Sequence, residues 1–484
     1  MIGSQCSLLA DLTAVCRQVK SRLVPNAQFR AAVEKKAEEI RSAVERECKR
    51  AGLSAEVRLD GSVAKDTWIL DYADLDVFMR VSPTLTKTQL RDVCLPPAKR
   101  ALYPNKIVER FAEHPYVETA VEFGKGRTLR VNVVPCYNVE RGQWLSATDR
   151  SPYHTDYVRQ HLNPSQRDEV RLLKAFLRGI GTYGADIKTG GFSGMLCETL
   201  IASRGEFERV VADFSVWRET KFIDVENYYQ GREDEVHRIF QEPLIVIDPV
   251  DKGRNLGAAV RREQLWNFVA ASRFLIAHPS TSLFEEPKVR PLTGTNYRRI
   301  VKARGSTILA IITGRIEAVV DILWSQMYRT ERAVVNLLAS NNFSVIRSMS
   351  WSDEQSLNVI LIELEEDELP VSKKHLGPPV SRPTESASFL NKHVKTEGTI
   401  SGPWMEGERW VVEKKREYSS AKGLLRTALK SGGNDIGVAS EFARHFRRRV
   451  VILRNESVGT LIERNQEFAN AMTIFLSGRP AWLE

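Results

Sequence analysis

The hydrophobic and polar positions of the chain follow two periods in different segments, the roughly 3.6-residue period of a helix and the two-residue period of a strand. Over residues 7–51 the apolar residues recur at helical spacing, and Pro25 interrupts the run. The first of these apolar residues are Leu8, Leu9, Leu12, Val15 and Val19. We expect a helix on either side of Pro25, and we expect both helices to cover a sheet that begins at Ala55.

Period-2 alternation marks the strands of this first region. Residues 55–59 alternate, and residues 116–123 and 128–134 do so again, with a glycine-containing turn at 124–126 that indicates a hairpin. Residues 75–79 form an apolar segment that we also interpret as a strand. Residues 83–103 are expected to form a loop and a helix. The pattern therefore predicts a mixed sheet with helices beside it.

From residue 151 the pattern becomes mainly helical, and strands return at intervals. We expect one helix to open at 151–157, another to run over 170–180, and a buried strand at 243–249 to lead into a loop that carries Arg254. The later expectations are helices over 308–328, 332–339, 420–430 and 442–449, strands over 343–349 and 357–364, and a loop over 370–383.

Composition and charge narrow the class of protein. The 484 residues are 42% hydrophobic, which is enough to build about two to four domains with their own cores. Lys and Arg number 70 against 61 acidic residues, so the net charge is +9 and the pI is near 9.2. Such an excess suits a phosphate-rich partner such as nucleic acid, although many basic enzymes bind none.

The cysteines and the apolar runs indicate in which cellular compartment we expect the protein. Six cysteines lie without CxxC spacing, which favours free thiols in a reducing compartment and no zinc site. Asp11 and Arg17 interrupt the first apolar run, so we expect no secretory signal. Residues 308–324 carry three charges and are too amphipathic to span a membrane. We expect a cytoplasmic protein that does not contact membranes.

Two carboxylates and a glycine-serine turn form the main candidate site. Asp74 and Asp76 lie two residues apart, so on a strand they share one face and repel each other unless a cation lies between them. Mg2+ prefers carboxylate oxygens together with phosphate oxygens. Upstream, Gly61 lets a backbone approach a phosphate, and Ser62 and Lys65 can donate to its oxygens. An acid pair alone is more often a solvated strand edge, but the ordered combination favours metal-assisted nucleotidyl transfer.

Further polar residues extend this candidate site. A third metal ligand is expected on the hairpin, and the position that would supply it holds Asn132. His154, Lys174 and Tyr183 suit the ribose and phosphates of a nucleotide, although each type is individually more often a surface or capping residue. The glycine-rich segment 190–198 leads into a helix and could cradle a phosphate, but a helix-packing turn is the first interpretation.

Two later segments indicate RNA, each with a structural alternative. Residues 404–418 interleave aromatic and basic side chains, which suits stacking on RNA, and a strand packed on a core explains them equally well. Residues 442–449 form a strongly basic helix that could contact phosphates or simply face solvent. The acids at 363–368 are interpreted as a solvated strand edge.

A series of short motifs occurs in a fixed order along nearly the whole chain. They are Gly61-Ser-Val-Ala-Lys-Asp-Thr67, Asp74-Leu-Asp76, Val131-Asn-Val-Val-Pro-Cys-Tyr137, Ser151-Pro-Tyr-His-Thr155, Arg171-Leu-Leu-Lys-Ala-Phe-Leu177, Gly191-Phe-Ser-Gly-Met-Leu-Cys-Glu198, Ile247-Asp-Pro-Val-Asp251, Lys374-His-Leu-Gly-Pro-Pro379 and Gly402-Pro-Trp-Met-Glu-Gly407. In this order they resemble the class I, archaeal-type CCA-adding enzymes, which are tRNA nucleotidyltransferases of the polymerase β superfamily.

The resemblance implies both a fold and a reaction. The fold would be α+β and multidomain, with a polymerase β-type nucleotidyltransferase head at 1–145, a helical neck at 146–275, and an RNA-recognition-like α/β body and tail at 276–484. The reaction would add C, C and A to the 3′ end of tRNA from CTP and ATP without a template, by a two-metal mechanism with Mg2+. The tRNA acceptor stem would be the partner, and a homodimer is kept as a candidate assembly.

The resemblance also implies roles for individual residues. Asp74, Asp76 and the residue at position 132 would be the catalytic and metal-binding set. The implied nucleotide-binding residues are Gly61, Ser62, Lys65, His154, Lys174, Tyr183 and Arg254, of which Arg254 lies in a segment that resembles the base-discriminating one.

The chain departs from the family pattern at Asn132, where members usually have aspartate. An asparagine has the shape of aspartate without its charge, so it is a poor Mg2+ ligand and cannot act as a base. We expect nucleotide binding to survive and chemistry to be slower by orders of magnitude, in a chain altered to trap a complex or in a natural variant. The alternatives kept open are a poly(A) polymerase or oligoadenylate synthetase-like enzyme, and a catalytically silent RNA-binding homologue.

Overall fold

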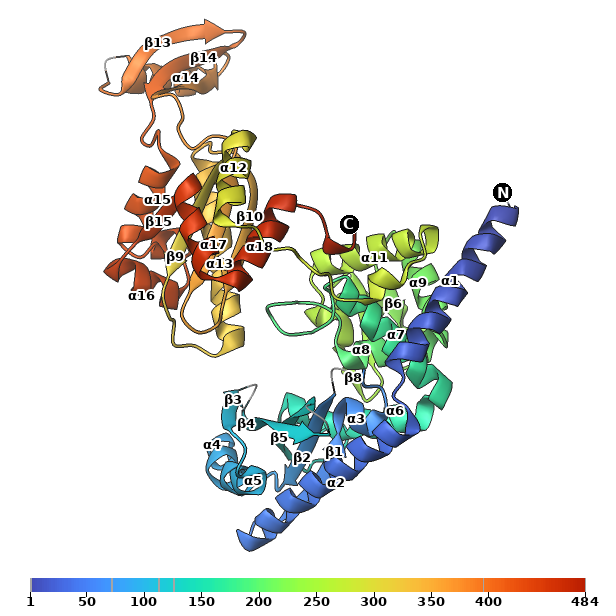
Figure 1. Ribbon diagram of the computed structural model, residues 1–484. Helices are drawn as coiled ribbons and strands as arrows, with labels where there is room; N and C mark the ends of the chain where they lie inside the picture. Colours follow the sequence, from blue (N-terminus) through green and yellow to red (C-terminus); the bar gives the residue numbers. More distant parts are fainter. Residues whose placement is uncertain (1, 71–72, 112–113, 125–126, 395, 484) are drawn as a thin grey trace. The chain divides into compact units, whose positions relative to one another are not determined.

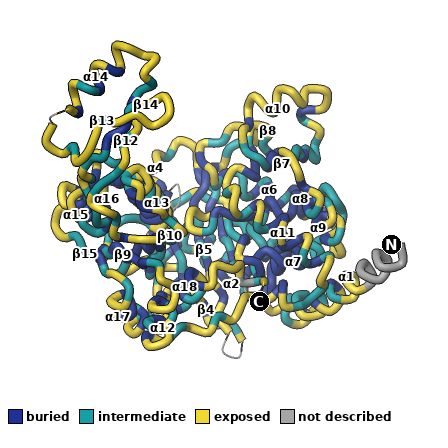
Figure 2. The backbone as a smooth tube through the Cα atoms, turned by 90° about the horizontal axis from the view of Figure 1, so that it is seen from above, coloured by how far each residue is buried: buried dark blue, intermediate teal, exposed yellow. Residues whose placement is uncertain are grey.

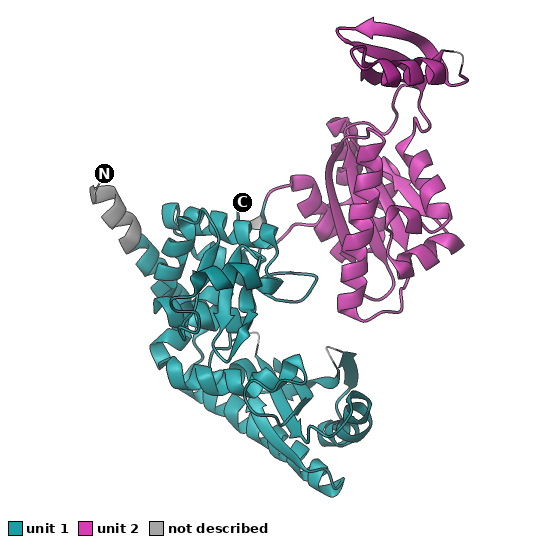
Figure 3. Ribbon diagram, turned by 180° about the vertical axis from the view of Figure 1, so that it is seen from behind, with its two compact units in different colours: residues 1–288, 480–484 teal, residues 289–479 magenta. Residues whose placement is uncertain are grey.

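A computed structural model describes residues 2–70, 73–111, 114–124, 127–394 and 396–483. The chain divides into two compact units, unit 1 of Met1–Lys288 with Pro480–Glu484, and unit 2 of Val289–Arg479 (Figure 3). Both units mix helices with sheets (Figure 1), so the predicted α+β, multidomain class is confirmed. None of the described helices is both long and apolar enough to cross a membrane.

A five-stranded sheet forms the first part of unit 1. Its strands are β1 (Ala55–Asp60), β2 (Asp74–Val81), β3 (Ile107–Phe111), β4 (Pro115–Phe123) and β5 (Arg127–Tyr137), in the order β1-β2-β5-β4-β3. Only β2 and β5 run parallel; the other neighbours are antiparallel. The predicted strands and hairpin are confirmed, although residues 125–126 of the turn lie outside the described residues. β3 was not predicted, because its sequence does not alternate.

The two N-terminal helices pack on different parts of unit 1. α2 (Ala27–Arg50) packs on β1 and on α5 (Leu95–Leu102), and its buried stripe shares a core with the strands. α1 (Ile2–Leu23) instead packs on α7 (Pro164–Gly179) and α11 (Arg262–Ala277). The expectation that both helices cover the sheet was therefore wrong for α1. Helical spacing identifies an apolar face but not the partner that buries it.

The remainder of unit 1 is mainly helical, as predicted, around a second core. Its other helices are α6 (Ser151–His161), α8 (Gly194–Arg204), α9 (Phe207–Ser215) and α10 (Glu233–Ile239), whereas the short helices α3 (Gly61–Lys65) and α4 (Lys87–Gln89) belong to the first part of the unit. Every residue of α7 from 170 to 177 is buried, and the dark segments of Figure 2 follow α7, α8 and α11. Arg171 and Lys174 lie within that buried run, so their charges need partners inside the protein.

A small sheet of β6 (Lys221–Ile223), β7 (Leu244–Asp248) and β8 (Asp251–Asn255) completes unit 1. The predicted strand at 243–249 is β7, and all five of its residues are buried. The expected loop after it was wrong, since residues 251–255 pair with β7 as β8. A charged and glycine-containing sequence gave no apolar period from which this strand could be predicted.

Unit 2 is built on a four-stranded sheet in the order β10-β11-β9-β15. The strands β9 (Thr307–Thr313), β10 (Val345–Ser352), β11 (Asn358–Leu364) and β15 (Val451–Arg454) alternate with α13 (Val320–Ser340) and with α15 (Ala421–Lys430) and α16 (Ser440–Arg448). Apart from the segment 372–415 inserted after β11, this β-α-β-β-α-β order is the predicted RNA-recognition-like arrangement.

Both faces of that sheet are covered by helices. α13, α15 and α16 bury one face, and α12 (Gly294–Arg304), α17 (Gly459–Arg464) and α18 (Gln466–Ser477) bury the other. All residues of β11 and nearly all of β9 are buried in consequence. RNA-recognition domains stack bases on an open sheet face. In this chain helices pack on both faces of the corresponding sheet, most completely over β9 and β11.

Two sequence expectations in unit 2 were wrong. The helix expected over 308–328 is the strand β9 followed by α13, because a short run of buried apolar residues fits a strand and a buried helix equally well. The loop expected over 370–383 contains β12 (Ser372–Pro379), a strand interrupted by a register shift.

β12 belongs to a second small sheet, in the order β12-β14-β13. β13 (Thr399–Glu406) and β14 (Arg409–Lys415) supply the aromatic and basic segment, and α14 (Pro383–His393) packs on the sheet. Trp410 is partly buried and donates from Nε1 to Ser386 Oγ at 3.2 Å, whereas Trp404 is 37% exposed. Trp410 thus fits the interpretation of a strand packed on a core, whereas the Trp404 side chain is accessible to solvent.

The acids expected at a solvated strand edge include two buried residues. Glu363 accepts from Arg304 Nε at 2.8 Å and pairs with Arg347 Nε at 3.0 Å. Asp367 accepts from Thr307 and from Arg454. The expectation was wrong for these two because the pairing arginines come from distant segments, which local sequence does not reveal.

Removing the Glu363 carboxylate should loosen unit 2. We expect Glu363→Ala to destabilise it by about 3–5 kcal/mol, because two arginines lose their shared buried anion. Hydrogen exchange of the β9 and β11 amides in the full chain measures this loss. Glu365→Ala, at an exposed neighbouring position, is the matched control. Equal protection in the two variants would contradict the assignment.

Candidate active site

The register of the first sheet aligns four polar side chains across its strands. Asp60 of β1 lies opposite Asp76 of β2, Asp76 lies beside Asn132 of β5, and Asn132 lies opposite Glu118 of β4. Side chains at paired positions share a face of the sheet. The predicted neighbours Asp76 and Asn132 are therefore brought together, and Asp60 and Glu118 are additions that only the strand pairing reveals.

Asn132 contacts Asp76 directly. Its Nδ2 donates to Asp76 Oδ1 at 2.9 Å, and its own Oδ1 is buried without a hydrogen-bond partner among the described residues. Burial raises the pKa of Asp76 to about 7, although the hydrogen bond from Asn132 acts in the opposite direction. The raised pKa means that the ionised form of Asp76 has too little compensating charge around it.

Asp74 lies on the same face of β2, two residues from Asp76, as predicted. Its side chain is 45% exposed, and Arg130 Nε lies 3.4 Å from its Oδ1. Among the described residues, no group of three or more His, Cys, Asp or Glu is arranged to hold a metal ion. Asp74 and Asp76 together fit an ion that completes its coordination with substrate oxygens. The amide of Asn132 gives Asp76 a donor, where a third ligand would have to supply an oxygen to the ion.

Gly61 is fixed by its contact with Asp76. Its φ is +72°, and a Cβ there would lie 2.0 Å from Asp76 Oδ2. Only glycine fits both the backbone conformation and this approach. The sequence suggested that Gly61 admits a phosphate; the described neighbour that requires glycine is the Asp76 carboxylate.

A cavity of about 670 Å³ opens beside Asp74. Of the predicted residues, Ser62, Asp74, Lys174 and Tyr183 line it. The lining residues that the sequence did not single out include Glu118, Arg130 and Arg178. Their side chains come from β4, β5 and α7, so no local motif joins them. A cavity with several cationic side chains beside an acidic edge suits a metal-bound polyphosphate.

Lys65 lies behind this cavity rather than in its lining. It is 7% exposed, and its Nζ donates to Glu198 Oε2 at 2.8 Å. Glu198 Oε1 accepts from Thr67 Oγ1 at 2.6 Å and from Lys174 Nζ at 3.2 Å. Burial opposes ionisation of Glu198, but the charges of Lys65 and Lys174 outweigh it and lower the pKa to about 2. Glu198 ends the motif 191–198, but no local pattern in the sequence indicates its role.

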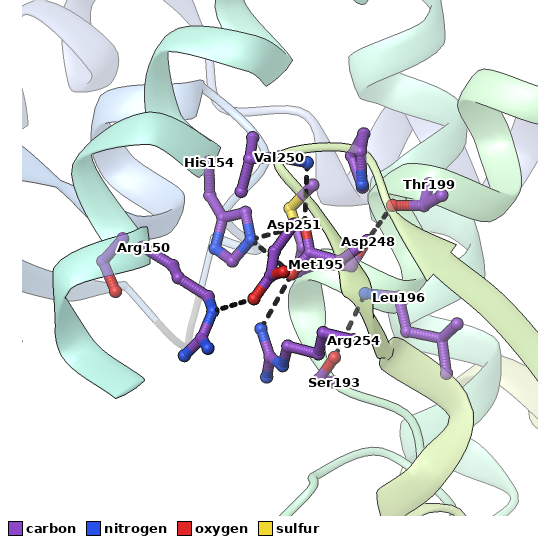
Figure 4. A network of polar contacts seen from close by, with 12 residues as sticks. Arg150, His154, Ser193, Met195, Leu196, Thr199, Asp248, Val250, Asp251 and Arg254 are labelled. Carbon is purple, nitrogen blue, oxygen red and sulfur yellow. Dashed lines mark hydrogen bonds and ion pairs between the residues drawn. The ribbon is translucent and has the colours of Figure 1, made fainter. Parts of the chain in front are cut away.

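His154 and Arg254 converge on Asp248 (Figure 4). His154 Nε2 lies 2.9 Å from Asp248 Oδ2, and Arg254 Nη1 donates to the same oxygen at 2.9 Å. Beside them, Arg150 pairs with Asp251 at 2.7 Å. Burial lowers the pKa of His154, although Asp248 acts to raise it. The structure thus brings these two predicted residues together, outside the lining of the cavity.

These features are those of a nucleotidyltransferase site: a glycine-serine turn, two acids on the strand β2, and a cavity lined by several cationic side chains. The family description "tRNA nucleotidyltransferase, second domain" matches residues 168–285, and "CCA-adding enzyme, C-terminal domain" matches residues 304–447. The CCA-adding enzyme of Methanothermobacter thermautotrophicus is 34% identical over 88% of this chain and 90% of its own. That of Methanopyrus kandleri is 33% identical over 97% of this chain and 98% of its own.

The chain therefore belongs to the CCA-adding enzyme family of tRNA nucleotidyltransferases. Enzymes of this kind generally use divalent metal ions. Among solved structures, the chain is similar to a cytoplasmic RNA terminal U-transferase, with 13% identity, a TM-score of 0.42, and coverage of 58% of this chain and 100% of the other. It is similar also to the E. coli MS115-1 CdnC structure with ATP, with 16% identity, a TM-score of 0.42, and coverage of 56% and 94%.

The contact between Gly61 and Asp76 makes a test of the site geometry. We expect Gly61→Ala to cost more stability than the roughly 1–2 kcal/mol of a left-handed backbone alone, because the new methyl group also displaces the Asp76 carboxylate. Chemical denaturation of the full chain measures the free energy of unfolding of this variant and of a matched control. Gly52→Ala is the control, since its φ is +67° and nothing lies within 4 Å of its Cβ. If Gly61→Ala lowers the free energy of unfolding no more than Gly52→Ala does, Gly61 does not pack against the Asp76 carboxylate.

Proposed function

We propose that this chain adds the nucleotides C, C and A to the 3′ end of tRNA, from CTP and ATP and without a nucleic-acid template. The observation that carries the proposal is the 34% identity to a protein named CCA-adding enzyme over 88% of the chain. In the reaction the terminal hydroxyl of tRNA attacks the α-phosphate, the bond between the α- and β-phosphates breaks, and pyrophosphate leaves.

The chain's own residues would bind and orient the nucleotide. Ser62, Lys174 and Tyr183 line the cavity and would hold the triphosphate and ribose, with Lys65 supporting Lys174 from behind. Asp74 and Asp76 would hold Mg2+, which when bound neutralises phosphate charge and acidifies the attacking hydroxyl.

The cluster around Asp248 would meet the base. Asp248 orients His154 and Arg254, and the Arg254 side chain is 42% exposed, so it can turn toward a bound base. Arginine presents several donors in a fixed plane, which suits discrimination between cytosine and adenine.

Asn132 would impair the chemical step while leaving nucleotide binding in place. Its side chain has no negative charge for a second metal ion, and it donates a hydrogen bond to Asp76, which an ionised aspartate could not do. The two-metal mechanism that the family resemblance implies would then proceed with one ion well held. A natural variant with reduced activity is consistent with this.

We propose that residues 1–145 act as the catalytic head, 146–275 as the neck, and 276–484 as a tRNA-binding body and tail. Both faces of the main sheet in unit 2 are covered, so tRNA would bind to exposed cationic surfaces instead. Arg447, Arg448 and Arg449, at the end of α16, are exposed and basic. The free thiols of five described cysteines and the tRNA substrate support a cytoplasmic location, and self-association into a homodimer stays a prediction.

The basic end of α16 provides a test of tRNA binding. We expect the double variant Arg448→Ala, Arg449→Ala to weaken tRNA binding and to reduce the salt slope by about 1 for each phosphate contact removed. Binding isotherms over a range of NaCl concentrations measure both. Arg464→Ala, at an exposed position elsewhere in unit 2, is the control. An unchanged slope in the double variant would exclude α16 as a phosphate contact.

The reaction itself is tested at position 132. We expect Asn132→Asp to extend tRNA that lacks its 3′ end by two cytidines and one adenosine, about a hundredfold to ten-thousandfold faster than the chain as it stands, because position 132 then supplies a charged oxygen ligand. Gel analysis of the product with CTP alone, ATP alone and both measures length and base choice. Asn138→Asp adds the same charge at an exposed position and should leave the rate unchanged.

Other products would point to the alternative functions. A long adenosine tail from ATP alone would indicate a poly(A) polymerase, and short adenosine oligomers made without tRNA would indicate an oligoadenylate synthetase. Binding of tRNA with no transfer by either form, in Mg2+ or Mn2+, would indicate a silent RNA-binding homologue. Each of these outcomes would overturn the proposal.

A further inference from the structure

Glu198 is a buried carboxylate that joins two parts of unit 1 at the wall of the cavity. It lies on α8 and is 1% exposed. Lys65 and Thr67, which contact it, belong to α3 and the turn that follows, next to the five-stranded sheet. Lys174, its third partner, comes from α7. One side chain of the helical part therefore holds the phosphate-binding turn and a cavity-lining lysine together.

The contacts of Glu198 form a closed network. Lys174 Nζ donates to Thr67 O at 3.1 Å and lies 3.0 Å from Thr67 Oγ1, while the Thr67 hydroxyl donates to Glu198 Oε1. The second carboxylate oxygen accepts from Lys65. Each oxygen of Glu198 thus accepts a hydrogen bond from a different lysine, and the Thr67 hydroxyl bridges the carboxylate and Lys174.

The charges in this network do not cancel. Two ammonium groups share one carboxylate, and both lysines are buried, Lys65 at 7% and Lys174 at 2% exposure. A buried excess of positive charge is costly unless an anion lies beside it. The excess borders the cavity through Lys174, which is part of its lining.

The first turn of α8 meets Lys174 at the same place. A side chain at Gly194 would begin 3.4 Å from Tyr183 Oη and 3.6 Å from Lys174 Nζ. Lys174, Tyr183 and the N-terminal turn of α8 therefore lie together at the cavity wall, with Glu198 one turn further along the same helix. The N–H groups that open a helix lack intrahelical partners, so this turn can add donors to an anion beside Lys174, although the Leu196 N–H already donates to Ser193 Oγ.

We propose that Glu198 is a positioning residue for triphosphate binding. It holds Lys65, Thr67 and Lys174 in place as their shared anion, and it leaves Lys174 able to donate a hydrogen bond to the phosphates of the incoming nucleotide. The inference rests on the proposed function, since it assigns the cavity to a nucleoside triphosphate. Glu198 does not touch the reacting atoms and acts through the lysines. Without it, two like charges would lie close together and turn away from each other.

The test measures phosphate binding directly and does not require transfer. Isothermal titration of the full chain with ATP and with inorganic tripolyphosphate compares the natural chain with Glu198→Gln. We expect both ligands to bind about tenfold to a hundredfold more weakly, the fold-change that corresponds to one charge-assisted hydrogen bond. In transfer assays of the Asn132→Asp form, the KM for CTP should rise by a similar factor while kcat changes less.

Glu169→Gln is the matched control. Glu169 is a partly buried glutamate on α7 that accepts from Lys20 Nζ at 2.7 Å and from the Phe207 amide at 3.0 Å, outside the cavity lining. We expect this variant to bind both ligands like the natural chain. Equal affinities for Glu198→Gln and the natural chain, or equal losses in Glu198→Gln and Glu169→Gln, would overturn the proposal.

A milder variant covers the case in which Glu198→Gln does not fold. Thr67→Val keeps every charge and the shape of the side chain but removes the hydroxyl that bridges Glu198 and Lys174. We expect severalfold weaker binding of tripolyphosphate, and unchanged binding would mean that the network is only structural. If tripolyphosphate and ATP bind as expected but the Asn132→Asp form does not extend tRNA, the proposed function fails and the role of Glu198 stands.

Discussion

The parallel pairing of β2 with β5 brings together side chains that lie 56 positions apart in the chain. It sets Asp76 beside Asn132 on the same face of the sheet, with Asp74 at the accessible end and Gly61 packed against the Asp76 carboxylate. The antiparallel neighbours β1 and β4 extend the polar row on either side. A shift of one residue in this pairing would turn the acids to the opposite face and remove the site.

The helical part of unit 1 completes the site through buried charges. Arg171 and Lys174, one turn apart on α7, both reach the segment that follows α3: Arg171 pairs with Asp66 and donates to Trp68 O, and Lys174 donates to Thr67 O. Glu198 adds its carboxylate from α8. Such buried ion networks contribute little net stability but penalise every arrangement in which a charge loses its partner. They therefore fix where the glycine-serine turn lies relative to α7 and α8.

Sequence patterns predicted the parts of this architecture that depend on local periodicity. The acid pair and the glycine-serine turn were found because strand and turn geometry place such residues predictably from their spacing. The sequence of β9 predicts a helix as readily as a strand, because its run of buried apolar residues has no period of its own. Glu118, Glu198 and the role of Asp248 were missed because they depend on which elements pack together. The sequence also could not show that Lys65 is turned toward Glu198, away from the cavity lining.

We propose that Asn132 leaves a two-carboxylate site that holds one metal ion well and a second poorly. Electron paramagnetic resonance of Mn2+ bound to the full chain, with tRNA and a non-hydrolysable CTP analogue, measures the number of tightly held ions most directly. The account predicts one tightly bound ion in the chain as it stands and two after Asn132→Asp. Two equally tight ions in both forms would contradict it.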